Sequence, residues 1–365
     1  MIKPRKILFI APLPPPVHGS AMMSQYIKDS TPVNETFECD FVNLSISRKM
    51  NEIGKFSFMK IWRFVSAYFI VLWKVLTHRY DVCYLAITCY GVGFLKDMPF
   101  VCLTKIFAKQ LVIHQHNKGM SSCVNKFPYK WLLPFTYKNT KVILLSWHLY
   151  DDIAQVVSKD QILICPNGIP SVSIEQDHDE NGDSIPHLLF LSNLLPSKGV
   201  IELLDACQNL KTKGLQFICD FVGGETKEIS RLDFEQEVDN RGLKDICIYH
   251  GPQYGEDKNR FFKQADIFVQ PTYNDCFPLT LVEAMQLGLP VVSTFEGGIP
   301  DIVQDGVTGL LCEQQNVEAL TKTLEKLLLD KELCMQMGQR GFLRYQEKFT
   351  LPVFEQNMAH ILSSL

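Results

Sequence analysis

Short apolar runs alternate with longer amphipathic segments along most of the chain. Six runs in the first half have the length and composition of buried strands: Ile7–Ala11, Cys39–Val42, Val82–Ala86, Leu111–Ile113, Val142–Leu145 and Ile162–Cys165. Five more follow in the second half: Leu188–Leu191, Phe217–Val222, Ile246–Tyr249, Ile267–Val269 and Val291–Ser293. Helix-length segments separate most of them, which is typical of parallel sheets with crossover helices. The pattern predicts two doubly wound α/β domains, which bind ligands at the carboxyl ends of their strands.

The boundary between the domains is predicted at Ser171–Pro186, a polar and acidic segment without periodicity. We therefore expect an N-terminal domain over residues 1–170, a linker over 171–186 and a C-terminal domain over 187–349. The end of the chain has a helical pattern throughout, and its last helix spans about residues 350–365. The full length of 365 residues is enough for two domains of ordinary size.

Composition places the protein among globular chains, with 46% apolar and 21% charged residues. The twelve cysteines include no CxxC pair, so we expect reduced thiols, with disulfides as the weaker alternative. No apolar stretch approaches the roughly 20 residues of a membrane span. The run Ile7–Ala11 is too short for the hydrophobic region of a signal peptide. We therefore expect a cytoplasmic protein.

Charge is divided unevenly along the chain. Residues 1–150 hold 19 Lys and Arg against 7 Asp and Glu, a net charge of +12, and the remainder carries −16. A basic half would be drawn to anionic lipid or phosphate. The alternative is that opposite charges help the two domains to face each other. The segment Phe56–Arg79, rich in aromatic and basic residues, fits a helix at a membrane surface, although such helices are more commonly buried crossovers.

The densest chemical signal lies in Ala265–Gln304. A buried strand ends at Pro271, a polar turn follows, and a short amphipathic helix runs from about Leu279 to Leu287. A helix start exposes N–H groups and a partial positive charge that suit phosphate. Asp275 precedes this helix and Glu283 lies within it, where a carboxylate can accept hydrogen bonds from sugar hydroxyls. Together they suggest a nucleotide-sugar site.

Other candidates also follow predicted strands. Gly19, in a proline-rich loop, would let the backbone approach a ligand, and Ser20 would cap the next helix. His114 and His116 end a strand on the same face. A hydrogen-bonding histidine in a cleft is the favoured interpretation, while a metal pair has no evident third ligand. His114 could also be a surface loop residue.

Three more candidates lie in the second half of the chain. Lys198 precedes a helix start, where its ammonium group could reach a diphosphate. Gly223 and the pair Gly297-Gly298 would permit close approach of backbone to a nucleotide, although plain turns fit equally well.

Assembled, these residues resemble the retaining glycosyltransferases of family 4, which have GT-B architecture. The resemblance spans nearly the whole chain and is densest over residues 190–311. It includes the PNG turn Pro166–Gly168, Lys198-Gly199, the acid pair Asp275 and Glu283, and the following GG-x-P element. The resemblance implies two Rossmann-like domains facing a deep interdomain cleft. It also implies that the C-terminal helix packs back on the N-terminal domain.

The resemblance also assigns roles. Glu283 would bind the ribose hydroxyls, Asp275 would lie by the donor sugar, Lys198 would neutralise the diphosphate and His116 would lie near the transferred sugar. The other donor-binding residues would be Gly19, Asn193, Gly223, Cys276, Phe277, Pro278 and Leu279.

Two positions depart from the family pattern. Asp275 stands where Glu is usual, and Asn193 stands where Arg is common. Loss of that arginine would weaken diphosphate binding or reflect a subgroup with another charge arrangement.

The implied activity is transfer of a hexosyl-type group from a nucleoside-diphosphate sugar to a hydroxyl of a saccharide acceptor, in cell-surface polysaccharide synthesis. We expect an acceptor linked to a polyprenyl lipid, association with the inner face of the cell membrane, no nucleic-acid partner and no cofactor or metal. Two alternatives stay open: a sugar-nucleotide epimerase of the same architecture, and a two-lobed sugar-binding protein without catalysis.

Overall fold

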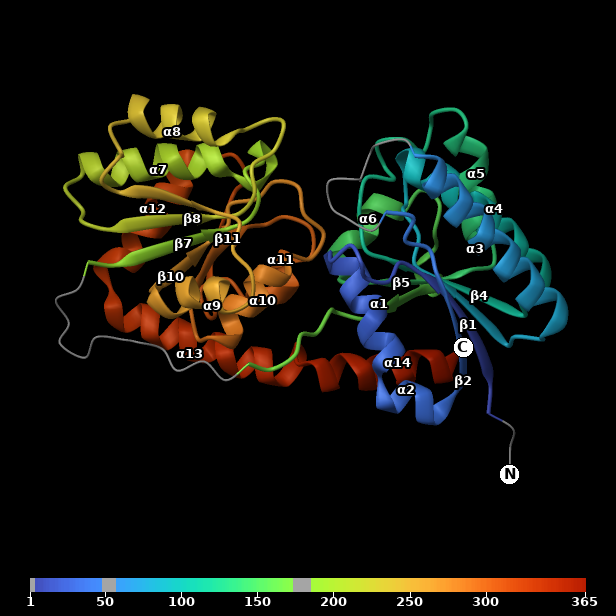
Figure 1. Ribbon diagram of the computed structural model, residues 1–365. Coiled ribbons are helices and arrows are strands. Elements are labelled where there is room, and N and C mark those ends of the chain that lie inside the picture. The colour runs from blue at the N-terminus through green and yellow to red at the C-terminus, as the bar shows by residue number, and fades with distance from the viewer. Residues whose placement is uncertain (1–3, 48–56, 173–184) are drawn as a thin grey trace. The chain divides into compact units, whose positions relative to one another are not determined.

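The computed structural model describes residues 4–47, 57–172 and 185–365. Most of the predicted linker, residues 171–186, lies outside the described residues. The chain divides into two compact units, which we call unit 1 and unit 2. Unit 1 comprises residues 1–168 together with 351–365, and unit 2 comprises residues 169–350. Figure 1 labels the elements of both units.

Unit 1 is an α/β domain around a six-stranded parallel sheet. Its strands are β1 (Lys6–Ala11), β2 (Glu38–Asn43), β3 (Val82–Leu85), β4 (Gln110–Gln115), β5 (Lys141–Leu144) and β6 (Ile162–Ile164). Its helices are α1 (Gly19–Asp29), α2 (Thr31–Thr36), α3 (Phe58–Thr77), α4 (Gly91–Phe107), α5 (Tyr129–Tyr137), α6 (Tyr150–Ile153) and α14 (Leu351–Ser364).

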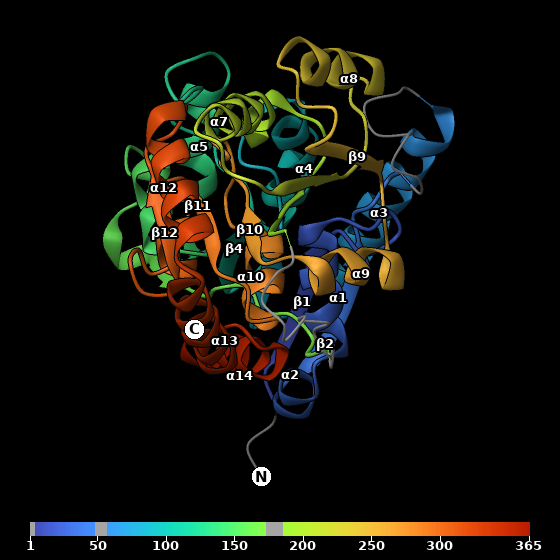
Figure 2. The same ribbon diagram turned by 90° about the vertical axis from the view of Figure 1, so that its left-hand side faces the viewer.

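Helices cover both faces of this sheet, whose strand order is β2-β1-β3-β4-β5-β6. Helices α1 and α14 lie on one face and α3, α4 and α5 on the other (Figures 1 and 2). The C-terminal helix α14 packs against α2 and α1. The order reverses between β1 and β3, so the loops after these strands diverge and leave room for a ligand.

Unit 2 repeats this architecture with a second parallel sheet. Its strands are β7 (His187–Leu191), β8 (Ile218–Val222), β9 (Cys247–Gly251), β10 (Ile267–Val269), β11 (Val291–Thr294) and β12 (Gly309–Cys312). Its helices are α7 (Val200–Thr212), α8 (Arg231–Asn240), α9 (Gly255–Gln264), α10 (Leu279–Gln286), α11 (Ile299–Ile302), α12 (Val317–Leu329) and α13 (Lys331–Lys348).

The sheet of unit 2 has the order β12-β11-β10-β7-β8-β9, with its reversal between β7 and β10. Helices α7 and α12 lie on one face, and α9 and α10 on the other (Figure 2). Fully buried side chains such as Phe190, Phe221 and Leu324 form the core between the sheet and the first pair of helices. Burial of such side chains contributes on the order of 2 kcal/mol each.

The prediction of two doubly wound parallel-sheet domains is confirmed, and all eleven predicted strands are present with ends that differ by one or two residues. A twelfth strand, β12, was not predicted. Among the described residues, no helix combines the length and apolar character that crossing a bilayer would require.

Candidate active site

Lys198 and Asp275 meet at the point where the strand order of unit 2 reverses. Lys198 ends a short 3-10 turn after β7, and Asp275 lies in the loop after β10. The Lys198 Nζ and an Asp275 carboxylate oxygen form an ion pair at 2.5 Å, and both side chains are less than one-fifth exposed. Lys198 also donates to the Asn274 carbonyl. The structure therefore brings together two of the predicted residues at the usual ligand-binding edge of a doubly wound sheet.

A second acid holds the Asp275 loop in place. Glu296, which is 4% exposed, accepts a hydrogen bond from the Asp275 backbone N–H at 3.0 Å. Gln314 donates to the other carboxylate oxygen of Glu296. The next residue, Gly297, has φ +52, and an added Cβ there would lie 2.3 Å from the Asp275 carbonyl oxygen. The predicted glycine pair is therefore part of the same loop cluster as Asp275.

Glu283 lies on α10, about one turn beyond the helix start at Leu279, and its side chain is 27% exposed. Its carboxylate accepts a hydrogen bond from Lys258 of α9 at 2.8 Å. A partly exposed carboxylate with a displaceable ammonium partner remains able to bind hydroxyl groups.

The start of α10 follows Asp275 directly. Cys276 and Phe277 are buried, Pro278 is the N-cap residue, and Leu279 opens the helix. Proline has no side-chain acceptor for the first N–H groups, so their partial positive charge faces outward from the helix end.

The loops after β7 and β8 also pack together. Asn193 Oδ1 accepts a hydrogen bond from the Gly224 N–H at 3.0 Å. Gly223 has φ +156, and a Cβ added there would lie 1.9 Å from the Ser192 carbonyl oxygen. Only glycine fits this contact. The pair Gly223-Gly224 therefore allows the loops after β7 and β8 to pack closely.

In unit 1, Gly19 is the first residue of α1, after the proline-rich loop. The prediction that Ser20 caps this helix is wrong. His18 is the N-cap residue and accepts a hydrogen bond from the Ala21 N–H, and Ser20 instead bonds to His18 Nδ1 at 3.1 Å. An imidazole nitrogen can accept as a side-chain oxygen does, so the cap lies two residues earlier than predicted and the helix starts at Gly19.

His114 and His116 differ in burial. His114 is fully buried in β4 and its Nδ1 lies 2.5 Å from the Tyr84 hydroxyl, so the surface-loop alternative is wrong. His116 follows the strand, with its ring centroid 4.0 Å from that of His114. Burial, and then the charge of His18, lower the pKa of His116 to about 4. His116 is therefore neutral near pH 7 and can accept or donate a hydrogen bond.

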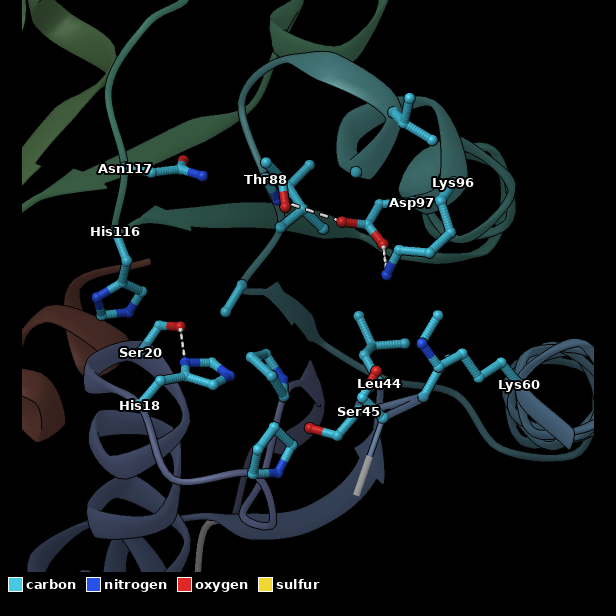
Figure 3. Close-up of a pocket in the computed structure, with 18 residues that line it drawn as sticks. His18, Ser20, Leu44, Ser45, Lys60, Thr88, Lys96, Asp97, His116 and Asn117 are labelled. Atoms are coloured by element: carbon cyan, nitrogen blue, oxygen red, sulfur yellow. Dashed lines mark hydrogen bonds and ion pairs between the residues drawn. The ribbon is translucent and has the colours of Figure 1, made fainter. Parts of the chain in front are cut away.

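A cavity of about 550 Å³ opens at the strand-order reversal of unit 1. We call it the polar pocket (Figure 3). Among its lining residues are His18, Ser20, Ser45, Ser47, Lys60, Thr88, Lys96, Asp97, His116 and Asn117. Most of these residues follow the carboxyl ends of β1 to β4 or lie in the first turns of helices. The volume is in the usual range of small-molecule sites, about 300–1,000 Å³.

Asp97 and Lys96 form the charged end of the polar pocket. Asp97 is 3% exposed, and its Oδ2 accepts a hydrogen bond from the Thr88 N–H at 3.2 Å. Its Oδ1 forms an ion pair with the Lys96 Nζ at 2.7 Å. Burial raises the pKa of Asp97, and the adjacent Lys96 opposes that rise. The pair fixes an ammonium group at the pocket wall (Figure 3).

Several of these groups were not predicted, namely Lys258, Glu296, Lys96 and Asp97. Lys258 and Glu296 contact residues more than 20 positions away in the chain, and Lys96 and Asp97 are identified by the pocket that they line. Nothing in the local sequence separates any of them from an ordinary surface residue. Within the described ranges, no three His, Cys, Asp or Glu side chains are arranged to hold a metal ion.

A protein-family model matches residues 173–344, and its description is "Glycosyl transferases group 1". Among curated proteins, the chain is 26% identical over 271 residues to lipopolysaccharide 1,2-N-acetylglucosaminetransferase of Salmonella typhimurium, covering 68% of this chain and 66% of that protein. It is 25% identical over 201 residues to the capsular polysaccharide biosynthesis glycosyltransferase CapM of Staphylococcus aureus, covering 53% and 51% of the two chains. The chain thus matches less than two thirds of the length of these relatives.

Solved structures share the fold over nearly all of the chain. Sucrose-phosphate synthase of Thermosynechococcus elongatus has a TM-score of 0.76 at 18% identity, covering 99% of this chain and 98% of that one. HepE of Anabaena in complex with UDP-glucose has a TM-score of 0.73 at 17% identity, covering 99% and 100%. At these identities the likeness concerns the fold alone.

Proposed function

We propose that the chain is a retaining glycosyltransferase of the family 4 type. The match of the glycosyl transferases group 1 model to residues 173–344 and the two parallel-sheet domains of GT-B type support this proposal. The enzyme moves a hexosyl group from a nucleoside-diphosphate sugar to a hydroxyl of a saccharide acceptor. Relatives named for lipopolysaccharide, colanic acid and capsule synthesis support a place in cell-surface polysaccharide assembly.

The observation that carries the proposal is the Lys198–Asp275 ion pair at the strand-order reversal, beside the start of α10. Departure of a nucleoside diphosphate builds negative charge on its phosphates. The Lys198 ammonium group and the N–H groups of α10 would stabilise that charge. When Lys198 turns to the diphosphate, the Asp275 carboxylate would be released from the ion pair and would contact the donor sugar.

Glu283 binds the ribose of the donor in this proposal. Its carboxylate is partly exposed and is held by Lys258 in the absence of ligand. The two ribose hydroxyls would replace the ammonium group as hydrogen-bond donors. HepE, solved with UDP-glucose, has the same fold and supports a nucleotide-sugar donor.

His116, Gly19 and the donor-binding backbone residues complete the proposed machinery. His116 is neutral near pH 7 because its pKa is about 4, so it would bind a sugar hydroxyl without adding charge. Retention at the anomeric carbon follows when the leaving phosphate takes the acceptor proton on the face from which it departs. Lys198 and the helix start supply the positive charge, so the proposal includes no metal or other cofactor.

Unit 1 would bring the enzyme to its acceptor at the inner membrane face. It holds 20 Lys and Arg against 11 Asp and Glu, a net charge of +9, which favours anionic lipid. Large apolar side chains of α3 are also exposed. Both features support a lipid-linked acceptor and peripheral association with the membrane.

The two alternatives predict other products. An epimerase would convert the donor without any acceptor, so product analysis with donor alone separates it from a transferase. A sugar-binding protein would hold nucleotide sugar without turnover over a wide acceptor panel.

The test combines donor binding with turnover in Glu283→Gln. A thermal-shift screen against UDP, GDP, ADP and their sugars should show a rise in Tm for the cognate base, because ligand binding stabilises the native state. In Glu283→Gln we expect donor affinity and transfer to fall by roughly 10- to 100-fold, since hydrogen bonds to a charged group contribute about 1.5–3 kcal/mol.

The control is Glu318→Gln, at an exposed position of α12, which should match the wild type. Wild-type affinity and turnover in Glu283→Gln would exclude the proposed donor site.

A further inference from the structure

The polar pocket adjoins a second cavity of about 800 Å³. We call this the α3 groove. Strand β2 and the loop after it form one side through Phe41–Asn43, and helix α3 forms the other through Met59, Trp62, Arg63, Ser66, Ala67 and Ile70. Ser45 and Ile46 line both cavities. The two cavities therefore share a stretch of wall, and a ligand that spanned both would pass the hydrogen bond that Arg63 donates to the Ile46 carbonyl at 2.8 Å.

The two cavities differ in chemistry. Lys60 and Lys96 both line the polar pocket, where their side chains extend toward its interior (Figure 3). Asp97 is the one carboxylate among the described residues that line this pocket, and it is engaged by Lys96 and by the Thr88 N–H. The pocket is therefore net positive and suits an anion.

The α3 groove, in contrast, is lined mostly by apolar residues, with Arg63 as the one charged side chain among the described residues of its wall. Met59 is 56% exposed and Trp62 69% exposed, although they lie beside the groove. Ile70 lines the groove about two turns further along α3. An extended hydrocarbon chain lying there would remove this apolar surface from water, worth roughly 25 cal/mol per Å².

We propose that the polar pocket and the α3 groove together bind one amphiphilic acceptor, a prenyl-type lipid with a diphosphate head. Lys60 and Lys96 bind the diphosphate, and the hydrocarbon chain lies along α3 toward the lipid. This rests on the proposed function, because it names the acceptor class of the same enzyme. Asp97 acts as a positioning residue that holds the Lys96 ammonium group at the pocket wall.

Isothermal titration calorimetry with three probes tests the proposal on the full chain. Farnesyl diphosphate, used below its micelle-forming concentration, should bind at least about tenfold more tightly than inorganic pyrophosphate or farnesol, since only it satisfies both cavities. Lys60→Met and Lys96→Gln should each weaken farnesyl diphosphate by about tenfold or more. Lys28→Gln, at an exposed position of α1 outside both cavities, should leave binding unchanged.

A separate variant tests whether the hydrocarbon chain binds in the α3 groove. Trp62→Ala should weaken farnesyl diphosphate but not inorganic pyrophosphate. Trp131→Ala is the matched control, because Trp131 is also 69% exposed and lines neither cavity. Equal binding of pyrophosphate and farnesyl diphosphate would overturn the amphiphile assignment, as would wild-type affinity in both lysine variants.

Two further measurements keep the outcome decisive. If Lys96→Gln does not fold because Asp97 loses its partner, the double variant Lys96→Gln/Asp97→Asn removes both charges at similar shape and should show the same loss. Glu283→Gln should bind farnesyl diphosphate as the wild type does. If the wild type binds farnesyl diphosphate but no nucleotide raises its Tm, only the donor site is contradicted. If a nucleotide raises the Tm but farnesyl diphosphate does not bind, only the acceptor assignment is contradicted.

Discussion

Gly297 shows at the scale of a single residue how the Asp275 loop depends on backbone geometry. Its φ of +52 strains any other residue, and a Cβ would collide with the Asp275 carbonyl oxygen at 2.3 Å. We therefore expect Gly297→Ala to lower the free energy of unfolding of unit 2 by about 2–3 kcal/mol. Urea titration followed by circular dichroism measures the change.

Gly214→Ala is the control for this prediction. Gly214 also has a positive φ, +81, but an added Cβ there would meet nothing within 4 Å. Gly214→Ala should therefore lower the free energy of unfolding by only about 1 kcal/mol, the penalty for the left-handed conformation. Equal losses in the two variants would mean that the contact with Asp275 contributes nothing.

His116 gives unit 1 a predictable dependence on pH. Its pKa is about 4 in the folded protein, below the ordinary value of about 6.5 for the unfolded chain. The unfolded state therefore binds more protons between these values, and stability falls as the pH is lowered. From pH 7 to pH 5 this residue alone should remove about 2 kcal/mol.

The comparison of wild type with His116→Gln isolates this effect from other titrating groups. Urea unfolding at pH 7 and pH 5 should show a smaller loss in the variant, by about the same 2 kcal/mol. An identical pH dependence in both proteins would mean that His116 titrates at its ordinary pKa.

The candidate donor-site residues could be selected from the sequence because their positions along the chain carry the signal. Lys198, Asp275 and Glu283 each stand at a fixed place relative to a strand end or helix start. Their partners were not predictable, because Lys258 comes from another helix and the side chains meet only in space.

Helix α3 has one buried face and one exposed face. One stripe is packed in unit 1, with Ala67, Val71 and Val75 buried. The opposite stripe is apolar and exposed, comprising Phe58, Trp62, Val65, Phe69, Trp73 and Leu76. The sequence left open whether this helix is a buried crossover or a surface element, and the structure shows that it is buried on one face and exposed on the other.

We expect the exposed stripe to insert into an anionic bilayer. Trp62→Ser/Trp73→Ser should reduce flotation with phosphatidylglycerol-containing vesicles by about tenfold or more, because aromatic side chains anchor interfacial helices. Raising the salt concentration should weaken wild-type binding as well, since screening reduces the attraction of the basic unit 1.

Leu232→Ser removes a side chain that is 77% exposed on α8 of unit 2, and should leave flotation unchanged. Undiminished flotation of the tryptophan variant would exclude α3 as the membrane contact.

Strand β12 illustrates an element that the pattern did not reveal. It has four residues and begins at Gly309, a residue that strands disfavour. Its glycine is required because a Cβ would lie 2.2 Å from the Val291 carbonyl oxygen. Pairing with β11 overrides the weak local preference.

At the scale of the molecule, the two units share one construction principle. Each has a six-stranded parallel sheet with a single reversal of strand order, and each places its candidate binding groups at that reversal. In unit 2 these groups are Lys198 and Asp275, and in unit 1 they line the polar pocket. Loops diverge from the reversal in opposite directions, so space for a ligand arises from topology in both units.

By itself the sequence determined the two parallel sheets and nearly every strand, and it singled out the candidate donor-site residues, because apolar periodicity and strand-end positions are local properties of the chain. Only the tertiary structure decided that the Lys96–Asp97 pair lines a pocket with His18 and His116, that Glu296 holds the Asp275 loop, and that Ser45 and Ile46 line both the polar pocket and the α3 groove. These features bring together residues far apart in sequence, and packing around the sheets fixes their positions.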